Sequence, residues 1–125
     1  MNIVSESFAE KMVVCSTDFD PDIDEYKVSN LSKINSKKIR PPRVEEAKIS
    51  FECTLNQIVE IGDGGAGSGF IVIGTIVLFH VADSVYDNGK IKLKNLNPLG
   101  RLAGNSYSRT KDTFEIIRKV KPLNK

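Results

Sequence analysis

The sequence predicts a mainly β protein with one domain, and three observations lead to this prediction. Apolar and polar residues alternate strictly over 47–55, which is the period of a strand with one buried face. The run 70–81 is apolar at nearly every position, as in a strand covered on both faces. Glycines crowd the stretch 62–69 between them, which favours a hairpin. With 125 residues and 40% apolar content, we expect residues 1–125 to form a single domain with a modest core.

The N-terminal third predicts one helix followed by a polar excursion. Ser5 or Ser7 is the expected helix cap, and apolar residues follow at helical spacing until the helix ends near Cys15. Residues 16–43 are polar and interrupted by three prolines. They predict an ordered excursion that adds no core element.

Further elements follow from the strand pattern and the turn residues. The alternation slips at Gln57 and then resumes, which permits a bulge. Asp-Asn-Gly at 87–89 predicts a turn, and a mixed segment follows over 90–102. We expect a short final strand over 113–117 and a frayed basic tail from Arg118.

The charge balance argues against polyanionic partners. The chain has 18 basic and 16 acidic residues, so the molecule as a whole exerts no strong field on nucleic acid or a membrane surface. Lys37, Lys38, Arg40 and Arg43 cluster around two prolines without aromatic residues that could stack on bases, which favours a solvated loop. We expect no binding to nucleic acid or membranes.

The sequence has no signal-peptide pattern and no candidate membrane span. The first residues lack a basic region followed by an apolar one, and no apolar run approaches about 18 residues. We therefore expect a soluble, cytoplasmic protein. Cys15 and Cys53 lack CxxC spacing, so we expect reduced thiols in the core rather than a disulfide.

Three patterns resemble ligand sites but favour structural interpretations. Gly62, Gly64 and Gly67 satisfy GxGxxG, yet strand-forming residues follow them where a dinucleotide site needs a helix. The alternating acids of 18–24 lack the glycine and the closing glutamate of a calcium loop. The sole histidine, His80, has no cysteine or acidic residue at ligand spacing, so a structural role is favoured over metal binding or base catalysis. We expect no metal site.

Five segments occur together in a fixed order and span almost the whole chain. They are NIVSESFAEKM, TDFDPDIDEY, KIRPPRVEEAKISFEC, VEIGDGGAGSGFIVIGTIVLFHV and DNGKIKLKNLNPLGRLAGNSYSRTKDTFEI. The last contains PLGRLxGxxYxR, the most specific pattern of the set. With this combination the chain resembles the flavin reductase-like proteins with an FMN-binding split barrel. The resemblance implies a six-stranded Greek-key barrel with short helices, of which this chain would hold the C-terminal two-thirds.

The resemblance also implies a cofactor, partners and an activity. Such proteins bind FMN noncovalently near a subunit boundary, so we expect FMN as cofactor, NAD(P)H or another electron donor, and a homodimer. The implied activity is electron transfer from NAD(P)H to flavin. Because the flavin carries the redox chemistry, no catalytic side chain is predicted.

The resemblance places five residues in the cofactor site. Arg101 could hold a phosphate or the electron-rich ring edge, Tyr107 could pack on the isoalloxazine, and Gly104, with Asn105 beside it, lets the backbone come close. Asn2 corresponds to a strand segment near the flavin in related reductases. The open alternative is that the four C-terminal residues of this set form only a structural turn at the dimer contact.

The family's first strands, whose Ser- and Thr-bearing loops receive the flavin phosphate, have no counterpart in this sequence. A barrel without them exposes strand edges and apolar core, which favours association between chains. Two interpretations stay open: a truncated fragment, which we favour, or a short protein that closes its edges by dimerising. The alternative function is therefore a non-catalytic dimeric binding module without flavin.

Overall fold

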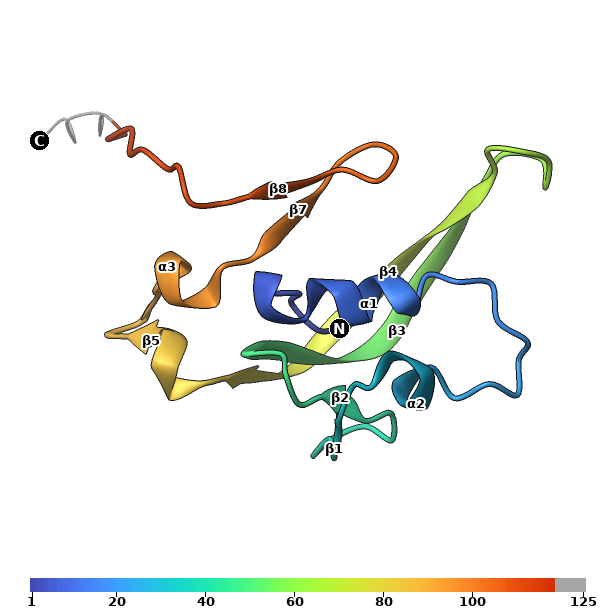
Figure 1. The fold of residues 1–125 in the computed structure, drawn as a ribbon, viewed down its shortest axis with the longest axis horizontal. Helices are drawn as coiled ribbons and strands as arrows, with labels where there is room; N and C mark the ends of the chain where they lie inside the picture. Colours follow the sequence, from blue (N-terminus) through green and yellow to red (C-terminus); the bar gives the residue numbers. More distant parts are fainter. Residues whose placement is uncertain (119–125) are drawn as a thin grey trace, which may run out of the picture.

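The computed structural model describes residues 1–118 and consists mainly of antiparallel strand pairs (Figure 1), which confirms the predicted fold class. Four two-stranded ladders pair β1 with β2, β3 with β4, β5 with β6 and β7 with β8. In chain order the elements are η1 (Glu6–Phe8), α1 (Ala9–Val14), α2 (Glu25–Ser29), β1 (Lys33–Ile34), β2 (Arg43–Val44), β3 (Ile49–Ile61), β4 (Gly69–Val81), η2 (Asp83–Val85), β5 (Tyr86–Asp87), β6 (Lys90–Ile91), α3 (Leu93–Leu96), β7 (Leu99–Arg101) and β8 (Tyr107–Arg109).

A long hairpin of β3 and β4 projects from the body of the molecule (Figure 1). Its 13-residue strands pair over their whole length with two register shifts, one of them between Leu55 and Gln57, so the bulge permitted by the sequence is present. In the connecting loop, Gly62, Gly64 and Gly67 have φ values of 93°, 88° and 91°, which residues with a side chain rarely adopt. The hairpin interpretation of these glycines is confirmed.

The first residues of the chain connect this hairpin to the C-terminal part. The Phe51 N–H donates to the Met1 carbonyl at 2.8 Å, and the charged Met1 amine donates back to the Phe51 carbonyl at 2.8 Å. On the other side, the Leu99 N–H donates to the Val4 carbonyl at 3.2 Å. Residues 1–5 therefore bridge β3 and β7.

The predicted N-terminal helix is present, but its predicted serine cap is not. η1 and α1 run over residues 6–14 and end one residue before Cys15. Ser5 occupies the N-cap position of η1 without a side-chain cap bond, and Ser7 lies inside η1. The reason is that Ser5 pairs with Pro98 in a backbone bridge and is only 1% exposed, so its hydroxyl is turned into the body.

The excursion 16–43 is ordered and adds no buried apolar residue, as predicted. Asp24 caps α2 by accepting a hydrogen bond from the Tyr26 N–H at 3.1 Å, and Asn30 ends the helix with φ of 54°. The α1 residue Lys11 donates to the Asn30 carbonyl at 2.6 Å. The excursion is thereby held against α1.

The hydrophobic core is small and lies at the base of the long hairpin. Its buried cluster consists of Ile49, Val85 and Leu96, and partly buried apolar residues such as Ile3 and Phe51 pack against it. The turn predicted at 87–89 joins β5 to β6 beside this cluster.

β3 buries polar residues on the face that the sequence predicted to be exposed, and the end of its apolar face is exposed. Ser50 and Glu52 are 0% exposed, whereas Leu55 is 65% exposed. The Ser50 hydroxyl donates to Asn2 Oδ1 at 2.9 Å, and the loop after β1 covers Glu52 with backbone N–H groups. Cys53 and the other cysteine are free thiols, as predicted, but only half-buried rather than in the core.

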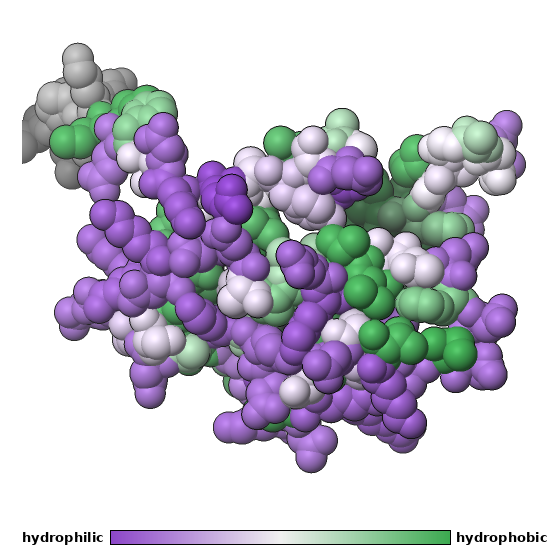
Figure 2. Space-filling model, in the orientation of Figure 1, coloured by the Kyte–Doolittle hydropathy of each residue, from purple (hydrophilic) through white to green (hydrophobic). Residues whose placement is uncertain are grey.

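β4 was predicted to be covered on both faces, and in this chain it is exposed on both. Its side chains include Phe70 at 70% and Val72 at 65% exposure, and hydrophobic surface shows in several places on the half of the molecule that carries the hairpin (Figure 2). A compact protein of 13.8 kDa exposes roughly 6,600 Å², whereas this chain exposes 10466 Å². The fold is therefore open.

The last described residues do not form the predicted strand. Residues 112–118 have no strand partner in the described part of the chain, and Phe114 and Ile116 are 85% and 83% exposed. Without a partner, the apolar alternation has no surface to pack on. The predicted frayed tail from Arg118 lies almost entirely outside the described residues.

Candidate functional site

The pattern that carries most of the predicted flavin residues forms a short hairpin of β7 and β8. Arg101 lies opposite Tyr107 in the register, and its guanidinium carbon is 4.9 Å from the centre of the Tyr107 ring. Arg101 Nη1 also donates to the carbonyls of Leu102 at 2.8 Å and Ser106 at 3.2 Å. The ring and the two carbonyls fix the guanidinium against its own turn.

Gly104 and Asn105 form the tip of this hairpin. Gly104 has φ of 59°, and a Cβ atom built on it would meet no atom within 4 Å. The backbone is therefore open to approach from outside. The Asn105 side chain makes no hydrogen bond within residues 1–118, so its amide is available to a ligand.

Tyr107 also lines a pocket of about 360 Å³ between the hairpin and the N-terminal helix. The other lining residues are Glu6, Ala9, Glu10, Leu99 and Arg109. Hydrogen bonds from Arg109 and Lys111 lower the pKa of Glu6, so the carboxylate is charged at neutral pH. The pocket thus joins an aromatic wall to a network of opposite charges.

Asn2 lies apart from the other four predicted residues. Its Oδ1 accepts hydrogen bonds from the Val44 N–H at 3.2 Å and the Ser50 hydroxyl at 2.9 Å. This side chain therefore ties β2 to β3, and no hydrogen bond joins it to the β7–β8 hairpin. Its predicted contact with flavin stays a prediction.

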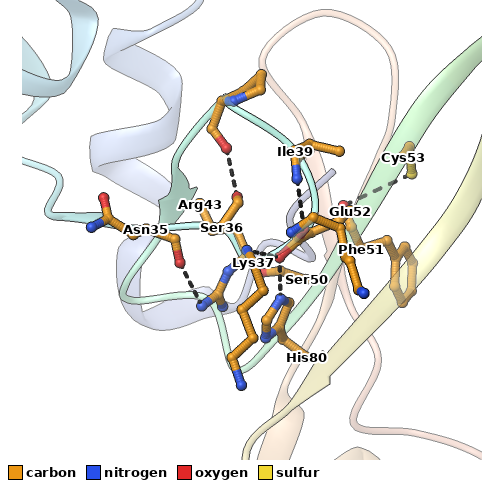
Figure 3. Close-up of polar contacts among 12 residues, drawn as sticks. Asn35, Ser36, Lys37, Ile39, Arg43, Ser50, Phe51, Glu52, Cys53 and His80 are labelled. Atoms are coloured by element: carbon orange, nitrogen blue, oxygen red, sulfur yellow. Dashed lines mark hydrogen bonds and ion pairs between the residues drawn. The ribbon is translucent and has the colours of Figure 1, made fainter.

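A buried charged cluster lies at the base of the long hairpin (Figure 3). The Glu52 carboxylate accepts hydrogen bonds from the backbone N–H groups of Lys37 at 2.8 Å, Lys38 at 2.6 Å and Ile39 at 3.2 Å. Its Oε1 also lies 2.5 Å from Nε2 of His80. The Lys37 and Lys38 side chains are exposed, as the predicted solvated loop requires.

Glu52 is ionised despite its burial. Burial opposes the charge, but the hydrogen bonds from the Lys37 N–H, the His80 ring and the Lys38 and Ile39 N–H groups outweigh it and lower the pKa of Glu52 to about 2. Because the carboxylate can only accept, His80 must carry a proton on Nε2.

The sequence analysis did not predict Glu52 as the partner of His80, because it considered only acidic residues close to His80 in the sequence. Glu52 pairs with Leu78 in the register of the hairpin, so His80 is its diagonal neighbour on the same face. Pairing the two predicted strands on either side of the glycine loop would have placed Glu52 close to His80. The structural role favoured for His80 gains a specific basis from this contact.

The described part of the chain offers neither a metal cluster nor a membrane-spanning helix. Within residues 1–118, no group of three or more His, Cys, Asp or Glu side chains could hold a metal ion. No helix among the same residues is long and apolar enough to cross a membrane.

Solved structures with the same fold include proteins from several bacteria. The nitrilotriacetate monooxygenase component B of Bacillus cereus is 32% identical, with a TM-score of 0.84 over 92% of this chain and 57% of that one. The 2-nitrobenzoate 2-nitroreductase of Pseudomonas fluorescens is 30% identical, with a TM-score of 0.80 over 95% and 58%. A split barrel protein of Shewanella frigidimarina shares the fold at 23% identity, with a TM-score of 0.77 over 94% and 59%.

The chain spans about half the length of the curated relatives that it matches, for example 53% of a protein of Aquifex aeolicus that is 34% identical over 108 residues. The family model for the flavin reductase like domain matches residues 1–100. Asn2 lies inside this match, and Arg101 to Tyr107 lie just beyond it. The chain belongs to the flavin reductase like domain family.

Proposed function

We propose that this chain binds FMN through the β7–β8 hairpin and serves in electron transfer from NAD(P)H to flavin. The observation that supports it most is the Arg101–Tyr107 pair, 4.9 Å from guanidinium carbon to ring centre, in a chain of a flavin reductase like family. When bound, a flavin supplies hydride and single-electron transfer, so the protein need only hold and orient it.

The hairpin residues fit the chemistry of a flavin ring. Tyr107 offers an aromatic face for stacking, and Arg101 offers N–H donors for the electron-rich edge of the ring. Gly104 leaves room for the ring to approach the backbone, and Asn105 has a free amide beside it. These four residues would bind and orient the cofactor, and we assign none of them a proton-transfer role.

We further propose that the protein is a homodimer that covers β4. The area exposed by this chain exceeds that of a compact protein of its mass by roughly 3,800 Å². A standard interface buries only about 800 Å² per partner. Exposed apolar side chains along β4, such as Phe70 and Val72, would supply the contact.

Flavin titration of variants tests the site. The quenching of FMN fluorescence measures affinity, and we expect Arg101→Ala and Tyr107→Ala each to weaken it roughly tenfold or more, the equivalent of about 1.4 kcal/mol. Lys33→Ala is the matched control, because Lys33 also lies 4.9 Å from the centre of a tyrosine ring, that of Tyr26, on another part of the chain. Equal affinities for all three variants would refute the site.

The alternative is a dimeric binding module without flavin, which the exposed β4 also supports. Under this alternative the folded protein is colourless and quenches no flavin fluorescence. If the hairpin residues instead form a structural turn at the dimer contact, Arg101→Ala and Tyr107→Ala would lower the molar mass.

A further inference from the structure

A pocket of about 390 Å³ lies beside the end of β4, apart from the hairpin that carries the flavin residues. It is lined by Arg43, Ala47, Lys48, Phe79, His80, Val81 and Ala82. Arg43 and Lys48 are positively charged, and the third basic group, His80, is paired with the Glu52 carboxylate, which is not part of the lining. The lining therefore favours a negatively charged ligand.

The two permanent cations of this pocket are not neutralised. Within residues 1–118, neither Arg43 nor Lys48 forms an ion pair with a carboxylate. Arg43 Nη2 donates to the Asn35 carbonyl at 3.3 Å and Lys48 Nζ donates to the Asn95 carbonyl, so each meets a neutral acceptor only. The positive charge of both side chains is therefore available to a ligand.

Arg43 also carries an unused donor. Its Nε is buried and has no hydrogen-bond partner within residues 1–118. A buried donor without an acceptor is unfavourable, and an oxyanion beside the guanidinium would supply the missing acceptor. Nε and Nη of one guanidinium match two oxygens of such an anion.

The ring of His80 is held in one orientation at the pocket. Nε2 donates to Glu52, whereas Nδ1 makes no hydrogen bond within residues 1–118. Figure 3 shows the groups around the ring: Glu52 from β3, Arg43 from β2 and Lys37 from the preceding loop. Nδ1 is thus the nitrogen that can meet a ligand in the pocket.

We infer that this pocket binds a phosphate group, held by Arg43, Lys48 and His80. Arg43 and Lys48 are the donors to the phosphate oxygens. Nδ1 of His80, whose Nε2–H already donates to Glu52, can accept a hydrogen bond from a P–OH group of the phosphate. The group could belong to inorganic phosphate or to a nucleotide such as FMN. The inference does not rest on flavin binding at the β7–β8 hairpin, because the pocket residues differ from the hairpin residues.

Nuclear magnetic resonance can test this on the full chain, because His80 is its only histidine. The imidazole C2–H resonance is followed while inorganic phosphate is added at constant pH and ionic strength. We expect a saturable movement with an apparent Kd of roughly 1 mM or tighter. Arg43→Gln and Lys48→Gln should each weaken the apparent affinity at least about tenfold. Lys92→Gln, which removes the same charge outside the pocket, should leave it within about twofold.

Further titrations distinguish inorganic phosphate from a nucleotide, and the pocket from the β7–β8 hairpin. Movement with FMN but not with riboflavin, which lacks the phosphate, assigns the pocket to a nucleotide. Movement with inorganic phosphate alone assigns it to the free ion, and flavin quenching in the same samples reports independently on the hairpin. The inference is wrong if neither inorganic phosphate nor FMN moves the resonance more than chloride does, or if both pocket variants bind phosphate like the wild type.

Discussion

The two ends of the β3–β4 hairpin differ in how they are stabilised. At the base, Ile49 is 6% exposed in the core, and Glu52 is 0% exposed with four hydrogen-bonding partners. Toward the tip, Ile58 is 51% and Val72 is 65% exposed, and only strand pairing holds the segment. The sequence is equally strand-like at both ends. Strand-forming residues therefore specify the hairpin, while other parts of the chain decide which end is fixed.

Truncating the same residue type at the two ends should give the largest difference. Ile49→Ala removes buried methyl groups and leaves a cavity, so we expect a loss of roughly 2–5 kcal/mol in the free energy of unfolding. Ile58→Ala on the same strand should change it by less than about 0.5 kcal/mol. Urea unfolding of both variants measures the difference. Equal losses would mean that the tip is packed against something in solution.

Low pH should destabilise the lower end of the β3–β4 hairpin, because Glu52 becomes protonated there. Its pKa is near 4.5 when unfolded and about 2 when folded, so its contribution is complete above pH 4.5 and is lost as the pH falls toward 2. Thermal unfolding from pH 7 to pH 2 should show a falling Tm in that window. Glu52→Gln should lower the Tm at pH 7 by roughly 5–10 °C and flatten the fall. An unchanged slope in this variant would show that other carboxylates cause the acid sensitivity.

The stability of the loop at the hairpin tip should depend more on Gly62 than on Gly69. Gly62 has φ of 93°, and an added Cβ would lie 3.1 Å from the Ser68 Cα, so we expect Gly62→Ala to cost about 1–3 kcal/mol. At Gly69 an added Cβ meets no atom within 4 Å, and Gly69→Ala should be close to neutral. Paired urea unfolding curves check both values. A larger loss at Gly69 would contradict the geometry of the loop.

The exposed strand should affect association more than stability. Val72→Lys places a charge on β4, and we expect it to reduce dimer formation while changing the free energy of unfolding of the monomer by less than about 0.5 kcal/mol. Val28→Lys on α2, where the side chain is 46% exposed, is the control. Light scattering after gel filtration gives both molar masses. The same dimer in both variants would exclude β4 from the interface.

The local sequence pattern predicted the features that depend only on backbone pairing between strands. The alternation over 47–55 and the glycines of 62–69 led to the right hairpin, and the break in the period at Gln57 permitted the bulge that lies between Leu55 and Gln57. The side-chain network at the base was not predictable in the same way. It depends on the excursion 16–43 folding back so that its backbone meets Glu52, which no local pattern specifies.

Burial was predicted less well than pairing, for a physical reason. An apolar run indicates that a strand needs cover, but the cover is supplied by other segments or other chains. Most of β4 has none within residues 1–118, and 113–117 has no strand partner among the same residues. For the site, Arg101, Gly104, Asn105 and Tyr107 were predicted to lie together, and they do so because all four belong to one short hairpin. Asn2, placed by resemblance alone, makes its hydrogen bonds elsewhere.

The most direct test is a titration of the purified 125-residue chain with FMN, followed by flavin fluorescence, with the molar mass measured in the same buffer. We expect saturable binding with a Kd of roughly 1 μM or tighter, one FMN per chain, and a dimer. A well-folded chain that binds no FMN at millimolar concentration would contradict the proposed flavin site.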